Sequence, residues 1–131
     1  MDELPIETSD DVVRVRQRVR EKAAGSGLSL VDQTKLVTAA SELARNALVH
    51  GGGGTARVEL VQSGVGRTGI RIAFSDKGPG IADLDLALTD GWTTGNGLGL
   101  GLSGARRLVD EFELVSKPGA GTSVVVTKWL R

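Results

Sequence analysis

The sequence contains no cysteine, which excludes a disulfide framework, a thiolate metal site and a cysteine nucleophile. It has no basic start followed by an apolar run, and no apolar stretch near the roughly 20 residues that a membrane span needs. Its 16 basic and 16 acidic residues cancel, so no overall field would draw the chain to nucleic acid or to an anionic membrane. We therefore expect a soluble, cytoplasmic protein that recognises its partners locally.

Glycine, in contrast, is in excess. The chain has 19 glycines in 131 residues, about twice the usual share of roughly 7%, and they are clustered. The length and the 40% hydrophobic content suit one compact domain over residues 1–131 with a core of its own. The glycine clusters are where we look for chemistry.

Hydrophobic periodicity predicts a helix over residues 9–24, capped by Ser9 or Asp10. A longer helix is expected from a capping box at Ser29 and Asp32 to about residue 50. The remaining elements are, in chain order, strands near 58–60 and 70–74, a helix over 102–110, and strands over 112–116 and 123–129, with a short edge strand near 4–6. This order predicts an α+β two-layer sandwich, with helices on one face of a mainly antiparallel sheet.

Glu42 and Asn46 lie four residues apart on the second predicted helix, so their side chains share one face. An amide oxygen suits Mg²⁺, which keeps water and substrate phosphates as its other ligands. Glu42 could accept the proton of a hydroxyl group or water that attacks a phosphate. A solvated helix face is the alternative for this pair taken alone.

Asp76 ends a predicted strand and opens the turn Asp-Lys-Gly-Pro-Gly, in which Gly78 and Gly80 permit backbone conformations that other residues avoid. A carboxylate at the edge of a cleft can accept a hydrogen bond from an exocyclic amine such as that of adenine. Thr122, at the start of the last strand, could help Asp76 hold a base directly or through water. An ordinary turn and an ordinary strand start are the alternatives.

The run Gly95-Asn-Gly-Leu-Gly-Leu-Gly101 leads directly into a predicted helix. Backbone N–H groups and the helix N-terminus would converge there, where phosphate oxygens could sit. The spacing matches neither a Rossmann fingerprint nor a Walker A loop. The candidates for contact with such phosphates in this loop are Gly97, Leu98, Gly99 and Gly101. Trp92, Leu98 and Leu102 could contribute to a partner surface, and a role in a lid or in the core is equally plausible for them.

His50 is the only histidine, and it stands beside four glycines at the expected end of the second helix. The helix dipole favours a histidine at that end. We therefore interpret His50 as a capping residue rather than a catalytic one.

The order of these motifs resembles that of the GHKL (Bergerat-fold) ATP-binding family of gyrase, Hsp90, histidine kinases and MutL. Glu42 and Asn46 would form its N box, residues 76–80 its G1 box and residues 97–101 its G2 box. The resemblance implies that Glu42 is the general base, Asn46 the Mg²⁺ ligand and Asp76 the adenine reader. It also implies that the pocket for the adenine base is shaped by Gly78, Gly80 and Thr122, and that the phosphates are held by Gly97, Gly99 and Gly101. The segment over about 82–96 would be the ATP lid.

Within that family, four stretches look most like the switch serine/threonine kinases of the stressosome: residues 41–46, 90–94, 110–112 and 128–131. The resemblance implies ATP and Mg²⁺ as cofactors, STAS-domain proteins as substrates, and activation of a PP2C-type phosphatase after release. Two other interpretations stay open, an anti-sigma factor kinase that binds a sigma factor directly and a non-catalytic, nucleotide-dependent binding module. The sequence also leaves open whether the chain forms a homodimer.

Overall fold

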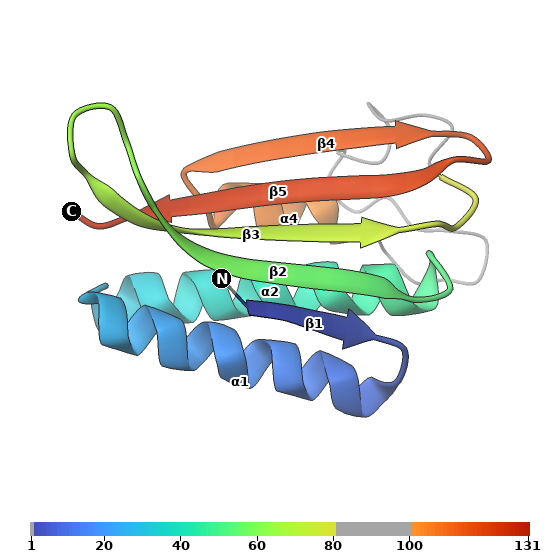
Figure 1. Ribbon diagram of the computed structural model, residues 1–131, viewed down its shortest axis with the longest axis horizontal. Helices are drawn as coiled ribbons and strands as arrows, with labels where there is room; N and C mark the ends of the chain where they lie inside the picture. Colours follow the sequence, from blue (N-terminus) through green and yellow to red (C-terminus); the bar gives the residue numbers. More distant parts are fainter. Residues whose placement is uncertain (1, 81–100) are drawn as a thin grey trace.

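The computed structural model describes residues 2–80 and 101–131 (Figure 1). The elements follow in the order β1 (Asp2–Ile6), α1 (Ser9–Ser26), α2 (Leu30–Val49), β2 (Gly54–Gln62), β3 (Thr68–Asp76), α4 (Leu102–Arg107), β4 (Glu111–Lys117) and β5 (Gly121–Trp129). The strands form one sheet in the order β1-β2-β3-β5-β4, and each neighbouring pair is antiparallel. The predicted α+β sandwich and its edge strand are therefore confirmed. Within the described ranges, no helix is both long and apolar enough to cross a membrane.

Helices α1, α2 and α4 lie on one face of the sheet (Figure 1), and alternate strand residues point into that layer. From the sheet, the buried set is Ala56, Val58, Ile70, Ile72, Phe74, Val124 and Val126. The helices add apolar stripes at spacings of three and four, which include Val15, Val19, Leu36, Ala40 and Leu43. Burying one such Val, Leu or Ile side chain contributes about 1.5–3 kcal/mol, so this shared core holds α2 against the sheet along its length.

The first helix is capped by Thr8, and the predicted caps Ser9 and Asp10 were wrong. The Thr8 hydroxyl oxygen accepts a hydrogen bond from the Asp11 N–H at 3.2 Å, and the Asp11 carboxylate accepts from the Thr8 N–H at 3.2 Å. The Asp11 carboxylate also accepts from the Glu7 N–H at 2.9 Å, and these bonds hold the pKa of Asp11 below its ordinary value. Three adjacent residues all have good capping side chains, and only the path of the backbone selects Thr8.

Several elements differ from prediction at their ends. Helix α1 continues to Ser26, two residues beyond the predicted end, and stops at Gly27 with a φ of 95°. Helix α4 stops at Arg107 rather than 110, because the Asp110 N–H bonds instead to the Thr127 carbonyl of β5 at 2.9 Å. Strands β4 and β5 are each two residues longer than predicted, with 7 and 9 residues.

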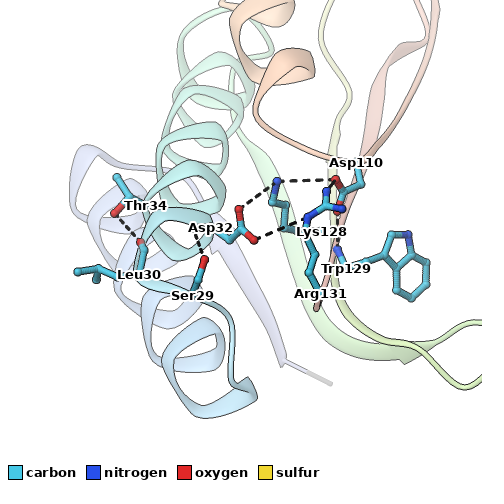
Figure 2. Close-up of polar contacts among 8 residues, drawn as sticks. All are labelled: Ser29, Leu30, Asp32, Thr34, Asp110, Lys128, Trp129 and Arg131. Atoms are coloured by element: carbon cyan, nitrogen blue, oxygen red, sulfur yellow. Dashed lines mark hydrogen bonds and ion pairs between the residues drawn. The ribbon is translucent and has the colours of Figure 1, made fainter.

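The first turn of α2 is joined to the end of β5 by a charge cluster of Asp32, Asp110, Lys128 and Arg131 (Figure 2). The Lys128 ammonium lies 3.5 Å from Asp32 and 3.7 Å from Asp110, although Lys128 is only 4% exposed. Arg131 pairs with both carboxylates. Ser29 caps α2 as predicted, with its hydroxyl accepting from the Asp32 N–H at 3.1 Å, but the Asp32 carboxylate is directed to the charge cluster instead of completing a capping box.

We expect Thr8→Ala to lower the free energy of unfolding by about 1 kcal/mol, because the side chain that accepts from the first turn of α1 is lost. Urea denaturation measures the change. Thr38→Ala is the matched control, since Thr38 is exposed inside α2 and alanine favours a helix interior. Equal destabilisation by both substitutions would contradict the cap assignment.

We expect Lys128→Met to lower the free energy of unfolding by about 3 kcal/mol, because two partly buried carboxylates lose the cation between them. Lys22→Met makes the same chemical change at a partly exposed ion pair, where Lys22 lies 3.2 Å from Asp2. That control should cost no more than about 1 kcal/mol. A loss in Lys128→Met no larger than the control's, in the same denaturation assay, would show that the cluster contributes little.

Candidate nucleotide-binding site

A pocket lies between the end of α2, the end of β3 and the start of β5. These ends of the three elements are on the right of Figure 1. The antiparallel register sets Asp76 directly opposite Thr122, so the G1 turn and the last strand meet there. Four predicted site residues line the pocket: Asn46, Asp76, Gly80 and Thr122. Its other lining residues are Leu43, Ala47, His50, Gly51, Phe74, Leu102 and Val124.

The Asp76 carboxylate is held by two backbone donors. Its Oδ1 atom accepts from the Gly78 N–H at 2.9 Å and from the Thr122 N–H at 3.3 Å. These bonds fix the plane of the carboxylate and use the same oxygen, which leaves Oδ2 as the atom able to accept from a ligand. The arrangement can therefore recognise a hydrogen-bond donor such as a ring amine.

Three glycines bring the backbone into contact with this aspartate. A Cβ added to Gly51 would lie 2.3 Å from Asp76 Cγ, and one on Gly121 would lie 2.1 Å from the Asp76 carbonyl oxygen. A Cβ on Gly78 would lie 2.6 Å from the Gly51 Cα atom. No larger residue can approach so closely, so glycine is required at each position. The sequence predicts Gly78 at the site but predicts Gly51 only as the end of a helix, although the four-glycine run over 51–54 is an available signal.

Gly80 and Thr122 complete the described part of the pocket around Asp76. Gly80 has a φ of 76°, and a Cβ there would lie 2.1 Å from the Lys117 carbonyl oxygen. The Thr122 hydroxyl lies 2.8 Å from the Ser116 hydroxyl on the neighbouring strand β4. Sequence reasoning missed Ser116, because only the pairing of β4 with β5 places it beside Thr122.

Glu42 and Asn46 come from successive turns of α2, and Asn46 lines the pocket. Glu42 lies against Gly101, where an added Cβ would be 2.4 Å from Glu42 Oε2. The structure therefore places Gly101, the described end of the predicted phosphate loop, beside Glu42, the predicted general base. The predicted loop residues Gly97, Leu98 and Gly99 lie outside the described residues, and so does the predicted lid over about 82–96.

His50 is the C-cap of α2, as predicted, and its backbone N–H bonds to the Asn46 carbonyl at 2.9 Å. Its side chain also lines the pocket, where burial lowers the pKa of the imidazole and favours the neutral form. Leu102 is 3% exposed, so it belongs to the core and the pocket wall rather than to an exposed partner surface.

In the part of the chain that the structure describes, no three His, Asp or Glu side chains gather as a metal cage. Mg²⁺ commonly needs only one or two protein ligands beside substrate phosphates and water. The amide of Asn46, at the pocket, fits that requirement. The chemistry of the site therefore suits a metal that arrives with a nucleotide.

The chain belongs to the histidine kinase-, DNA gyrase B-, and HSP90-like ATPase family, whose model matches residues 31–131. The family predicted from the motifs is thus confirmed, and ATP is the nucleotide that its members use. Serine/threonine-protein kinase RsbT of Bacillus subtilis (strain 168) is 44% identical over 126 residues, which cover 96% of this chain and 94% of the relative. At that identity over nearly the whole of both proteins, the chain is an enzyme of the kinase branch of the family.

Other relatives extend this picture. The anti-sigma F factor of Thermoanaerobacter sp. (strain X514) is 31% identical over 96 residues, covering 71% of this chain and 67% of the relative. A crystal structure of the RsbU and RsbW domains of a Mycobacterium tuberculosis protein matches all of this chain with a TM-score of 0.65 and 25% identity, over 33% of that longer protein. The catalytic domain of the histidine kinase ThkA matches 98% of this chain and 96% of its own length with a TM-score of 0.53 and 15% identity, which shows the shared fold alone.

We expect Gly51→Ala to weaken ATP binding at least about tenfold, because the new methyl group would displace the Asp76 carboxylate. Gly25→Ala is the control, since a Cβ at Gly25 meets nothing within 4 Å. Calorimetric titration of both variants with Mg-ATP measures the difference. Unchanged affinity in a folded Gly51→Ala variant would contradict the close packing of Gly51 on Asp76.

Proposed function

We propose that the chain binds Mg-ATP in this pocket and transfers the γ-phosphoryl group to a serine or threonine of a STAS-domain protein. We further propose that it works in a partner-switching stress-signalling module and activates a PP2C-type phosphatase once released. The observation that carries the proposal is the Asp76 carboxylate, oriented by two backbone donors within a pocket that Asn46 and Thr122 also line. The relationship to the RsbT kinase supports the choice of reaction.

At the base end, Asp76 Oδ2 would accept the exocyclic amine of adenine. Phe74, Val124 and Leu102 supply apolar surface in the same pocket, which suits the faces of a purine ring. The neutral form of His50 adds no positive charge to this wall.

At the phosphate end, Asn46 would be a ligand of Mg²⁺, which neutralises charge on the phosphates when bound. Glu42 lies one helical turn from Asn46 and would accept the proton of the attacking serine or threonine hydroxyl. The hydroxyl oxygen then bonds to the γ-phosphorus while the bond to the bridging β–γ oxygen breaks. The products are the phosphoprotein and ADP, with the proton on Glu42.

The anti-sigma F relatives favour a second candidate function, a kinase that also sequesters a sigma factor by binding it directly. Their identity to this chain is 30–31% over 71–78% of it, against 44% over 96% for the RsbT kinase. We therefore prefer the switch kinase. Tight capture of a sigma factor by the purified chain would reverse that preference.

The direct test is incubation with Mg-[γ-³²P]ATP and a STAS-domain protein. We expect label on that protein with the unmodified chain, and a decrease of at least about 100-fold with Glu42→Gln, because the base is lost while the nucleotide site remains. Asp76→Asn should lose ATP binding and labelling together. Glu59→Gln, a glutamate on strand β2 outside the pocket, is the matched control and should label normally.

Two results would overturn parts of this account. Full labelling by Glu42→Gln would remove Glu42 from the reaction. ATP binding without label on any STAS-domain protein, together with ATP-dependent partner binding, would favour a nucleotide-dependent binding module.

A further inference from the structure

Helix α1 carries an arginine at four alternate positions, and the fold divides these arginines between two faces. The buried residues of α1 form one stripe: Asp11, Val15, Val19 and Ala23. Each residue advances about 100° around a helix, so residues just before the stripe and residues just after it lie on opposite sides. Arg14 and Arg18 each precede a member of the stripe. Arg16 and Arg20 each follow one, so they occupy the other side of the helix.

The first pair of arginines is neutralised within the molecule. Arg14 Nη1 lies 2.7 Å from Asp11 Oδ1. Arg18 Nη1 lies 3.3 Å from Asp2 Oδ2 on the edge strand β1. The second pair is exposed and makes no ion pair or hydrogen bond with another residue of the ranges 2–80 and 101–131. The fold therefore compensates the charge on one side of α1 and leaves the charge on the other side to solvent or to a partner.

The uncompensated side of α1 faces a groove between α1 and α2. Arg20 lines this groove, together with residues of α2 and its first turn: Leu30, Gln33, Thr34, Val37 and Thr38. Arg20 is the one charged residue of that lining within the described chain. Leu30 is 77% exposed, and its side chain points away from the charge cluster (Figure 2). The groove thus combines a positive wall with an uncovered apolar end.

The groove leads toward the proposed reacting groups. Thr34, Thr38 and Arg45 share one stripe of α2, because spacings of 4 and 11 residues return to nearly the same side of a helix. Arg45 is exposed and also lacks an ion pair or hydrogen bond within the described ranges. It lies three residues beyond Glu42, or about 4.5 Å along the helix axis.

The three uncompensated arginines form a line along the two helices. Helices α1 and α2 run in opposite directions (Figure 1), so Arg16, one turn before Arg20 on α1, lies nearer than Arg20 to the end of α2 that carries Arg45. We call this line the basic strip: Arg20, Arg16 and Arg45. The strip begins at the groove and ends beside Glu42.

We propose that the basic strip docks the protein substrate through carboxylate side chains that lie close to its acceptor hydroxyl. An acidic partner would neutralise cations that the fold leaves uncompensated, and arginine binds carboxylates with paired N–H donors. Leu30 would pack against an apolar side chain of the same partner. Because the whole chain has a formal net charge of zero, no wider basic field favours a polyanion such as nucleic acid. This inference rests on the proposed kinase function, since it assigns the surface that holds that substrate.

The test compares two double variants that each remove two positive charges from α1. In Arg16→Gln/Arg20→Gln the uncompensated pair is lost, and in the matched control Arg14→Gln/Arg18→Gln the paired arginines are lost. The assay is steady-state labelling of the same STAS-domain protein, together with calorimetric titration by Mg-ATP. We expect the first variant to raise KM for the STAS-domain protein at least about tenfold, with kcat and ATP affinity within about twofold. The control should keep KM within about twofold.

Ionic strength gives a second readout. Salt screens attraction between exposed charges, so KM of the unmodified chain for the STAS-domain protein should rise between low and high salt. That rise should be smaller in Arg16→Gln/Arg20→Gln and undiminished in the control variant. Arg45→Gln should raise the same KM by about twofold to fivefold, the size of one exposed ion pair.

An unchanged KM in Arg16→Gln/Arg20→Gln would overturn the inference. So would an equal rise in both double variants, which indicates an effect of net charge alone. Loss of self-association or of sigma-factor capture, with KM unchanged, would assign the groove to another occupant and would also overturn it. Each of these results leaves labelling by the unmodified chain intact. Absence of labelling by the unmodified chain, despite ATP binding, would instead overturn the proposed function on which the inference depends.

Discussion

The hydrogen bonds from two backbone N–H groups to the Asp76 carboxylate connect segments that are far apart in the sequence. One donor follows Asp76 in the G1 turn, and the other is Thr122, on a strand 46 residues further along the chain. Gly51 and Gly121 lie so close to Asp76 that a residue with a side chain would not fit at either position. Because the carboxylate is held in one orientation, its second oxygen can be a specific acceptor rather than a mobile surface charge.

Helix α2 carries the rest of the proposed chemistry, and both of its ends are fixed to the sheet. Its first turn contributes Asp32 to the charge cluster around Lys128. Gly51, which follows the C-cap of α2, packs against Asp76 at the start of the G1 turn. Between these ends, buried apolar side chains hold the helix against β3 and β5. The position of Asn46 relative to Asp76 is therefore set by packing on the whole length of α2. Rigid elements of this kind are better suited than loops to hold reacting groups in place.

Much of this could be predicted because the signals are local. Periodic residues such as Leu36 and Leu43 indicated α2, and the turn chemistry after Asp76 indicated the G1 segment. The four-glycine run was a local signal for Gly51, but its contact with Asp76, like the place of Ser116 beside Thr122, depends on which distant segment packs against it. Strand register, rather than residue type, places Ser116 beside Thr122. Family motifs extended the prediction to Glu42 and Asn46, whose catalytic roles stay predictions.

The most direct test of the central claim is an amide NMR titration of the chain with Mg-ATP. If the base binds at Asp76, the largest shifts among the described residues should fall on the amides of Gly51, Gly78 and Thr122. The Lys128 amide, at the opposite end of β5, should scarcely move. ATP binding that leaves the Gly78 and Thr122 amides unshifted would contradict the account, because both donate to the carboxylate that is proposed to hold the base.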